Sequence, residues 1–303
     1  MWNVLGYGPL DSARQPPVDD GPDPYPWLEG TRIYSSWAKV VVKCHTKDGM
    51  VAKKVASKDR TVRSEAYMGK YAREVAGMKV PAFRGLEDYG GHKVIVTDLV
   101  PGHPLDLVWN QMTSQNKASI KQALKEQISL MRRCTAKNIC CVNRNGRPDL
   151  KMRIPDPYNP SRPTARLEPL ADEAAFDAWK VGMAERRGPP PYADLVKQKI
   201  KKLPAKHTNR FVLTHGDLTP GNILVRLADQ NAPAGPKNFY VISGIIDWQY
   251  SAFLPEYMEY TILKTNPAQE YWWRSFMCGL LEEMGLGCSN ARLDFEKHAT
   301  ALR

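Results

Sequence analysis

The sequence predicts an α+β fold, with a small antiparallel sheet in its N-terminal third and a mostly helical remainder. Two strand-like runs, residues 39–47 and 50–56, flank Asp48-Gly49, and Asp-Gly between such runs is a strong hairpin signal. Beyond residue 114, apolar residues recur at helical spacing. The 303 residues suffice for one two-lobed domain or for two small domains.

The early elements follow from the same patterns. Residues 1–30 are rich in proline and aspartate and predict an irregular arm. Residues 57–76 carry alanine, methionine and tyrosine at helical spacing and predict a helix. Residues 83–89 and 93–100 predict two further strands, and Pro101-Gly102 ends the second of them.

The later elements are mostly helices. Residues 114–137 predict a long helix with Ser114 as its N-cap. Residues 138–170, rich in proline, glycine and asparagine, predict an irregular insert. Pro189-Pro190-Pro191 separates two more predicted helices, and three follow near the C-terminus; their ranges are 172–186, 192–203, 256–264, 269–284 and 290–302.

Composition limits the classes of function. The formal net charge is +11, but the lysines and arginines are scattered and no aromatic residues interleave with them as in an RNA-binding sheet. We therefore expect no nucleic-acid partner. No apolar run approaches the roughly 18 residues of a membrane span, and no basic region precedes an apolar core as in a signal peptide.

The six cysteines show no metal-ligand spacing, which favours reduced thiols and a cytoplasmic protein; they are Cys44, Cys134, Cys140, Cys141, Cys278 and Cys288.

Residues 211–247 contain four polar residues whose arrangement suggests catalysis: His215, Asp217, Asn222 and Asp247. A strand-like run at 211–213 leads into a loop that Gly216, Pro220 and Gly221 impose. Residues 223–225 and 240–246 predict a hairpin, with turn residues at 229–237 between them. This hairpin would place Asp217 and Asn222 at one end and return Asp247 to the same end.

Such a group suits phosphoryl transfer, which needs a carboxylate beside the attacking hydroxyl and oxygen ligands for Mg²⁺. Asp217, Asn222 five residues later, and Asp247 supply both, because Mg²⁺ takes few protein ligands besides water and phosphate oxygens. The alternative is purely structural: His-Gly-Asp caps a turn and Asp247 ends a strand.

The motifs HGDLTPGNILV and GIIDW resemble the catalytic and metal-binding loops of the aminoglycoside phosphotransferase family, part of the protein-kinase-like superfamily. The resemblance is greatest to fungal members, in which the second motif continues toward Pro and Glu, as Pro255, Glu256 and Glu259 do here. It implies Asp217 as catalytic base and Asn222 with Asp247 as metal ligands. His215 would be a structural member of the loop.

The resemblance also implies a nucleotide site in a protein-kinase-like two-lobe fold. Strand alternation puts Ala52 and Lys54 on one face, so Lys54 is the preferred phosphate-binding lysine and Lys53 the alternative. Glu65 would pair with that lysine. The backbone carbonyl of Asp98 and the backbone N–H of Val100 would bond the adenine edge. Residues 31–100 would form the N-lobe and 101–303 the helical C-lobe.

The implied activity is transfer of the γ-phosphoryl group from ATP, or GTP, to a hydroxyl of a small molecule, with Mg²⁺. The alternative is a nucleotide-binding pseudoenzyme or scaffold of the same fold. A protein serine/threonine kinase fits less well, because the loop reads His-Gly-Asp and no Ala-Pro-Glu follows. Five glutamates could form an acidic cleft for a polycationic acceptor, although the +11 charge disfavours one at long range; they are Glu256, Glu259, Glu270, Glu282 and Glu283. The acceptor and the oligomeric state stay open.

Overall fold

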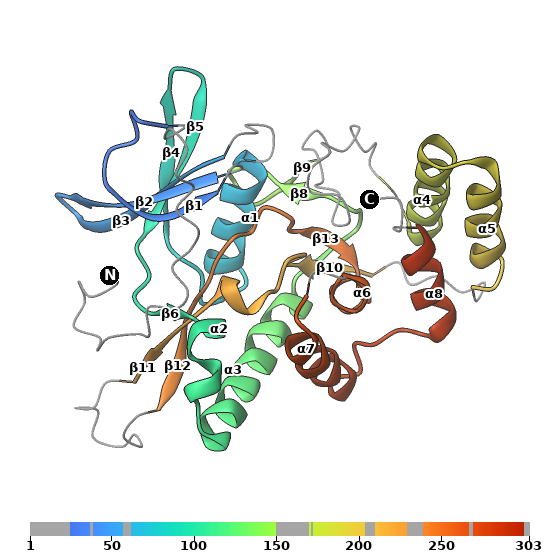
Figure 1. Cartoon of the computed structure of the whole chain (residues 1–303). Helices are drawn as coiled ribbons and strands as arrows, with labels where there is room; N and C mark the ends of the chain where they lie inside the picture. The colour runs from blue at the N-terminus through green and yellow to red at the C-terminus, as the bar shows by residue number, and fades with distance from the viewer. Residues whose placement is uncertain are drawn as a thin grey trace.

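The computed structural model describes residues 25–36, 39–56, 62–149, 170, 172–203, 210–228, 239–266 and 269–299 (Figure 1). The predicted arm up to residue 24, most of the predicted insert and the predicted turn at 229–237 lie outside this part of the chain. Within it, no helix is long and apolar enough to cross a membrane.

A five-stranded antiparallel sheet forms the N-terminal part of the fold, in the order β1-β2-β3-β5-β4. The predicted Asp-Gly hairpin is confirmed: Thr46 pairs with Gly49, which has φ +116°, a value that glycine adopts readily. The strands are β1 Thr31–Ser36, β2 Lys39–Thr46, β3 Gly49–Ala56, β4 Phe83–Tyr89 and β5 His92–Asp98.

Helix α1 (Val62–Glu74) packs against this sheet at β4 and β5. Val62 and Ala66 from the helix and Ile95 from β5 form a small buried cluster, which holds the helix against β5. Because α1 lies on the sheet, its buried Glu65 faces the strand that carries Lys54.

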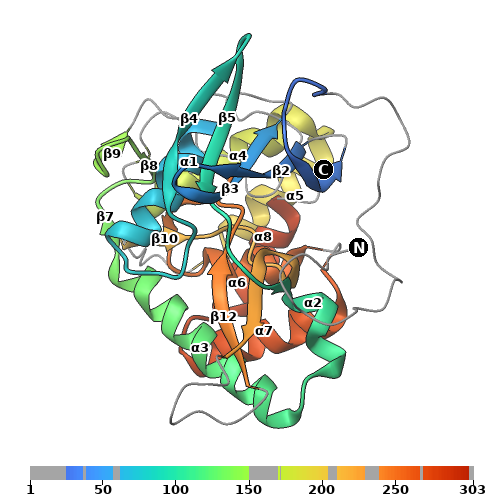
Figure 2. The same ribbon diagram turned by 90° about the vertical axis from the view of Figure 1, so that its left-hand side faces the viewer.

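Two further short sheets lie outside the large sheet, one near the centre of the molecule and one below the large sheet (Figures 1 and 2). In one, β10 (Phe211–Thr214) lies between β13 (Ala252–Pro255) and β7 (Thr135–Ala136). In the other, β11 (Ile223–Leu227) lies between β12 (Tyr240–Ile245) and β6 (His103–Pro104), which confirms the predicted second hairpin. A separate two-stranded sheet joins β8 (Cys141–Val142) and β9 (Pro148–Asp149).

The long helix α3 (Ser114–Arg133) lies in the C-terminal part of the fold (Figure 1). Ile120, Leu124, Ile128 and Met131 are fully buried at helical spacing. The prediction of Ser114 as N-cap is wrong by one residue. The Thr113 side chain accepts a hydrogen bond from the Asn116 N–H, because Ser114 already has helical geometry.

The remaining helices surround a core that contains Trp273, which is completely buried. The proline triplet separates α4 from α5 as predicted, yet Pro190 already begins α5, since proline fits the first turn of a helix. The elements are α2 Leu105–Val108, a 3-10 turn at Trp109–Gln111, α4 Glu173–Arg187, α5 Pro190–Ile200, a 3-10 turn (η3) at Pro220–Asn222, α6 Met258–Thr265, α7 Tyr271–Glu283 and α8 Asn290–Ala299. The fold is α+β, as predicted.

Candidate active site

Lys54 joins the two halves of the candidate site. Its Nζ lies 2.6 Å from Glu65 Oε1 on α1 and 2.7 Å from Asp247 Oδ1, which follows β12. Burial alone would lower the pKa of Lys54, but the charges of Asp247 and Glu65 outweigh burial and raise it. Lys54 is therefore a cation that two buried carboxylates hold in place.

The preference for Lys54 over Lys53 agrees with this geometry. Lys53 points to the other face of β3, where its Nζ contacts Glu87 at 2.7 Å and the Tyr89 hydroxyl at 3.1 Å. Successive strand residues face opposite sides of a sheet, so only one of the two lysines can reach Asp247.

Asp247 has an unusual backbone. Its φ is +67°, and no other residue except glycine has a positive φ in the part of the chain that the structure describes. A non-glycine residue in this region is strained, and such residues concentrate at functional sites. The neighbouring Ile246 N–H donates to the Asn222 carbonyl at 2.9 Å, while Lys39 and Lys54 bind the two carboxylate oxygens. These contacts offset the strain and aim the carboxylate toward the Lys54 ammonium.

Asp217 lies in the loop that follows β10. Gly216 has φ +79°, and a Cβ there would lie 2.4 Å from the Tyr250 carbonyl oxygen, so the loop requires glycine. The Asn222 amide donates to the Asp217 carbonyl at 2.9 Å and to Asp217 Oδ2 at 3.1 Å. Burial and then the nearby Asp247 charge raise the pKa of Asp217. The predicted trio of Asp217, Asn222 and Asp247 is thus brought together at one end of the β11–β12 hairpin.

The donor atoms of Asn222 and Asp247 fit a magnesium ion. The Asn222 NH₂ group is engaged by Asp217, which leaves its amide oxygen as the group that can coordinate. Asp247 is ionised, because the charges of Lys54 and Lys39 lower its pKa against the opposing effect of burial. One carboxylate and one amide oxygen are a typical protein share of a Mg²⁺ site.

His215 stabilises the loop from within. Its ring contacts the Ile246 carbonyl through Nε2 at 3.0 Å, and the Asp217 N–H donates to Nδ1 at 3.2 Å. The ring also packs edge-on against Trp248, with 4.7 Å between ring centroids. His215 therefore links the Asp217 loop to the segment before Asp247, as expected for a structural member of the loop.

The residues predicted to bond adenine lie where β5 leads toward the helical part. The Asp98 side chain turns outward to Arg84, with 2.5 Å between Oδ1 and Nε, so only its backbone could face a base. Val100 packs against Gly244 of β12, where a Cβ would come within 2.9 Å of Val100 Cγ1. The connection between the lobes is thus held against β12, close to Asp247.

Two residues of this site were not singled out for their roles from the sequence. Lys39 of β2 binds Asp247, and no short-range motif marks it. Glu259 of α6 was noted in the continuation of the second motif and as a possible member of an acidic cleft. It is completely buried, and its Oε2 accepts from the His215 N–H at 2.8 Å and the Gly216 N–H at 3.4 Å. A carboxylate in an otherwise uncharged helical run, MEYTIL, is a sequence signal that could have indicated this role.

Substituting Glu259 should test whether it positions the Asp217 loop. In Glu259→Ala the two buried N–H groups lose their acceptor, at a cost of about 1–3 kcal/mol each. We expect kcat to fall at least ~10-fold with little change in nucleotide affinity, since displacement of a catalytic group lowers the rate of the reaction itself. Steady-state kinetics measure both.

Glu259→Gln keeps an acceptor oxygen and should restore most of that kcat. Glu256→Ala is the matched control, because Glu256 lies on the same segment but pairs with Arg210 at 2.8 Å. If Gln and Ala lower kcat equally, the carboxylate does not act through its hydrogen bonds to the loop.

A two-lobed α+β fold with this polar group between its lobes defines a protein-kinase-like phosphotransferase. The chain belongs to the phosphotransferase enzyme family, whose family model matches residues 29–270. It is therefore a phosphotransferase with an alcohol group as acceptor. No curated protein matches the sequence.

Several solved structures have a similar fold. Aminoglycoside phosphotransferase APH(4)-Ia gives a TM-score of 0.59 at 12% identity, covering 89% of this chain and 83% of that chain. The apo form of its thermostable mutant gives 0.58 at 13%, covering 91% and 85%. A ternary complex of that enzyme with AMP-PNP and hygromycin B gives 0.57 at 12%, covering 89% and 83%. At these identities the likeness concerns the fold alone.

Proposed function

We propose that the protein transfers the γ-phosphoryl group of ATP, or GTP, to a hydroxyl of a small molecule. The observation that carries this proposal is the position of Lys54, which holds Glu65 and Asp247 together beside the Asp217–Asn222 pair. Residues 31–100 would then serve the nucleotide and residues 101–303 the acceptor. The APH(4)-Ia complex with AMP-PNP is a precedent for nucleotide binding by this fold.

Each residue has a separate task in this reaction. Asp217 Oδ2 is bonded to Asn222, so Oδ1 is the atom that would accept the acceptor hydroxyl proton. As the acceptor oxygen bonds to the γ-phosphorus, the bond to the nucleotide diphosphate breaks and the diphosphate leaves. Lys54, held by Glu65, would bind the α- and β-phosphates, while the Asp98 carbonyl and the Val100 N–H would bond the adenine.

Asn222 and Asp247 are the residues that would hold Mg²⁺. When bound, the ion would neutralise charge on the phosphate oxygens. Lys39 now pairs with Asp247 Oδ2 and would have to leave that oxygen before the ion could bind to it.

The contacts of the five glutamates give little support to a polycationic substrate. The glutamates expected to form an acidic cleft are engaged by internal partners: Glu256 by Arg210, Glu259 by the Asp217 loop, Glu282 by the Tyr260 hydroxyl, Glu283 by Lys121 and Lys125, and Glu270 by Trp272. We therefore propose an acceptor defined by its hydroxyl group rather than by positive charge.

Lys54→Met should separate the proposed phosphate contact from general charge effects. A hydrogen bond to a charged group is worth about 1.5–3 kcal/mol, so affinity for Mg·ATP should fall about 10- to 150-fold. Lys53→Met is the matched control and should change affinity less than about 5-fold, since a partly exposed ion pair contributes little. Isothermal titration with Mg·ATP and Mg·GTP measures both variants. Equal affinities in the two variants would contradict the assignment of Lys54.

Turnover distinguishes the kinase from a nucleotide-binding scaffold. Purified protein is incubated with γ-labelled ATP and a metabolite extract, and labelled products are separated and identified. The proposal expects a labelled phosphomonoester that is not formed by Asp217→Asn. Tight Mg·ATP binding with no labelled product from any hydroxylated acceptor would favour the scaffold alternative.

A further inference from the structure

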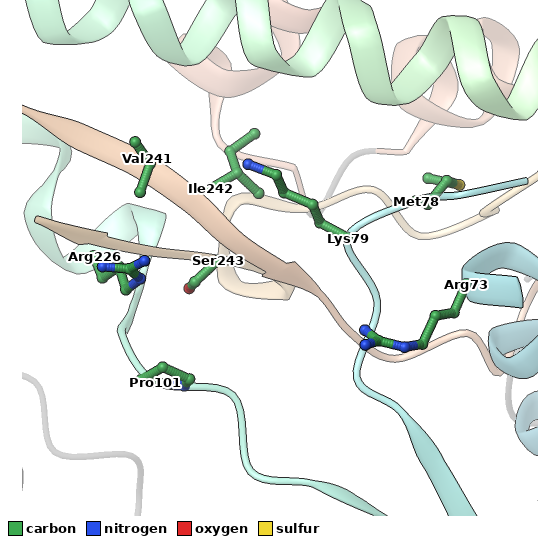
Figure 3. Close-up of a pocket in the computed structure, with 8 residues that line it drawn as sticks. All are labelled: Arg73, Met78, Lys79, Pro101, Arg226, Val241, Ile242 and Ser243. Carbon is green, nitrogen blue, oxygen red and sulfur yellow. The ribbon is translucent and has the colours of Figure 1, made fainter. Parts of the chain in front are cut away.

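A cavity of about 500 Å³ lies beside Pro101, which belongs to the connection between the two lobes (Figure 3). Its walls come from the end of α1, the loop after it, the segment after β5, and strands β11 and β12. This volume is within the range of small-molecule sites. None of the residues assigned to nucleotide, metal or catalysis lines it.

The cavity lining is positively charged. Arg73, Lys79 and Arg226 contribute three cations, and no acidic residue is present in the lining. Arg73 donates to the Val80 carbonyl at 2.5 Å and Arg226 to the Leu227 carbonyl at 3.1 Å. Within the described part of the chain, none of the three forms an ion pair with a carboxylate. Arginine N–H groups beyond those two bonds are therefore available to a ligand, and anionic oxygens are their best partners.

Ser243 supplies an independent sign of a missing partner. Leu224 pairs with Gly244 and Val225 with Ile242, so Ser243 is the extra residue of a β-bulge in β12. Bulges redirect side chains, and this one turns the Ser243 hydroxyl toward the space bounded by Pro101 and Arg226 (Figure 3). The hydroxyl oxygen is buried and has no hydrogen-bond partner among the described residues. A buried hydroxyl without a partner is costly, and a ligand oxygen would satisfy it.

We propose that this cavity binds a small organic anion, whose phosphate or carboxylate group contacts Arg226 and the Ser243 hydroxyl, while Arg73 and Lys79 add positive charge to the lining. Pro101, Met78 and Val241 would cover its apolar part. The site extends beyond the proposed reaction and does not depend on it. Its walls include the end of α1, the helix that carries Glu65, and strand β12, which leads to Asp247. A hydrogen bond from the Ile245 N–H of β12 to the Lys79 carbonyl, at 2.7 Å, joins that strand to the loop after α1.

The test uses the full-length protein with EDTA and two probes, inorganic pyrophosphate for phosphate groups and citrate for carboxylates. Isothermal titration should show binding of at least one probe to the wild type, and the probe that binds identifies the anionic group. Arg226→Gln should weaken that binding at least ~10-fold. Arg63→Gln, an exposed arginine on α1, makes the same charge change and should have little effect.

Two further variants locate the bound probe. Lys54→Met should keep probe binding, because Lys54 lies outside the cavity; loss of binding would place the probe at the proposed nucleotide site instead. Ser243→Ala removes an unpaired buried hydroxyl, so the melting temperature should not fall, yet probe affinity should decrease severalfold. Absence of binding of both probes to the wild type, or unchanged binding in both Arg226→Gln and Ser243→Ala, would overturn the proposal.

Discussion

Asp217→Asn is expected to reduce phosphoryl transfer about 10²- to 10⁴-fold while leaving nucleotide affinity nearly unchanged. A positioned general base contributes a factor of this size, and asparagine cannot take up the proton of the acceptor hydroxyl. The substitution keeps the shape of the side chain. Its amide oxygen can still accept from the Asn222 NH₂ group, which now bonds Asp217 Oδ2 at 3.1 Å. The loss should therefore appear in kcat rather than in folding.

Single-turnover kinetics with the acceptor identified from the extract measure this effect, and titration with Mg·ATP checks binding. Asp194→Asn is the matched control, since Asp194 is exposed on α5 and its nearest cation, Lys197, lies 4.0 Å away. A variant at position 217 that keeps more than about a tenth of the wild-type rate would show that Asp217 is not the base.

Lys180→Met is expected to lower the free energy of unfolding by about 3–5 kcal/mol, the usual cost of removing one partner from a buried ion pair. Lys180 on α4 is 2% exposed, and its Nζ lies 2.5 Å from Glu296 Oε1 on α8. Asp177 and Glu296 are completely buried, and Arg292 bonds Asp177 at 2.7 Å. With Lys180 removed, Asp177 and Glu296 would lose one of the two cations that they share, and the other, Arg292, also binds the buried Glu173 at 2.7 Å.

The Lys180 ammonium also lies 3.9 Å from the centre of the Phe176 ring, a cation–π contact that methionine would lose. Urea denaturation measures the change in stability. Lys197→Met is the control, because its pair with Glu185 is exposed and worth no more than about 1 kcal/mol.

A second variant separates loss of charge balance from loss of packing. Lys180→Met combined with Glu296→Leu removes both members of the closest pair, and apolar replacement of a buried ion pair is often nearly neutral. The double variant should therefore be more stable than Lys180→Met alone. If it is less stable by the sum of the two single effects, the two residues do not interact across α4 and α8 as the geometry indicates.

Much of the fold follows from local patterns in the chain. Asp48-Gly49 predicts a hairpin because glycine at the turn adopts a positive φ at no steric cost, and Gly49 does so. The fully buried residues of α3 follow a helical period that is readable without coordinates. The boundaries were less predictable, as the Thr113 cap and the Pro190 start of α5 show, because neighbouring residue types suit either position.

The candidate site was likewise only partly predictable from the sequence. Asp217, Asn222 and Asp247 were predicted together because one hairpin joins them, and strand alternation favoured Lys54 over Lys53. The partners that lie far apart in sequence were not predictable. Lys39 and Asp247 are separated by 208 positions in the sequence. Glu259 lies on α6 and reaches the Asp217 loop across 44 positions. The bulge that leaves Ser243 unpaired is likewise visible only in the register of β11 and β12.

The sequence by itself therefore determined most types of element and the grouping of Asp217, Asn222 and Asp247, because backbone preferences and motif spacing act over a few residues. The tertiary structure decided which cation meets which carboxylate and where a polar atom is left without a partner. Those outcomes depend on the packing of α1, α4, α6 and α8 against segments far away in the chain, and burial makes each such contact strong when it is satisfied and costly when it is not.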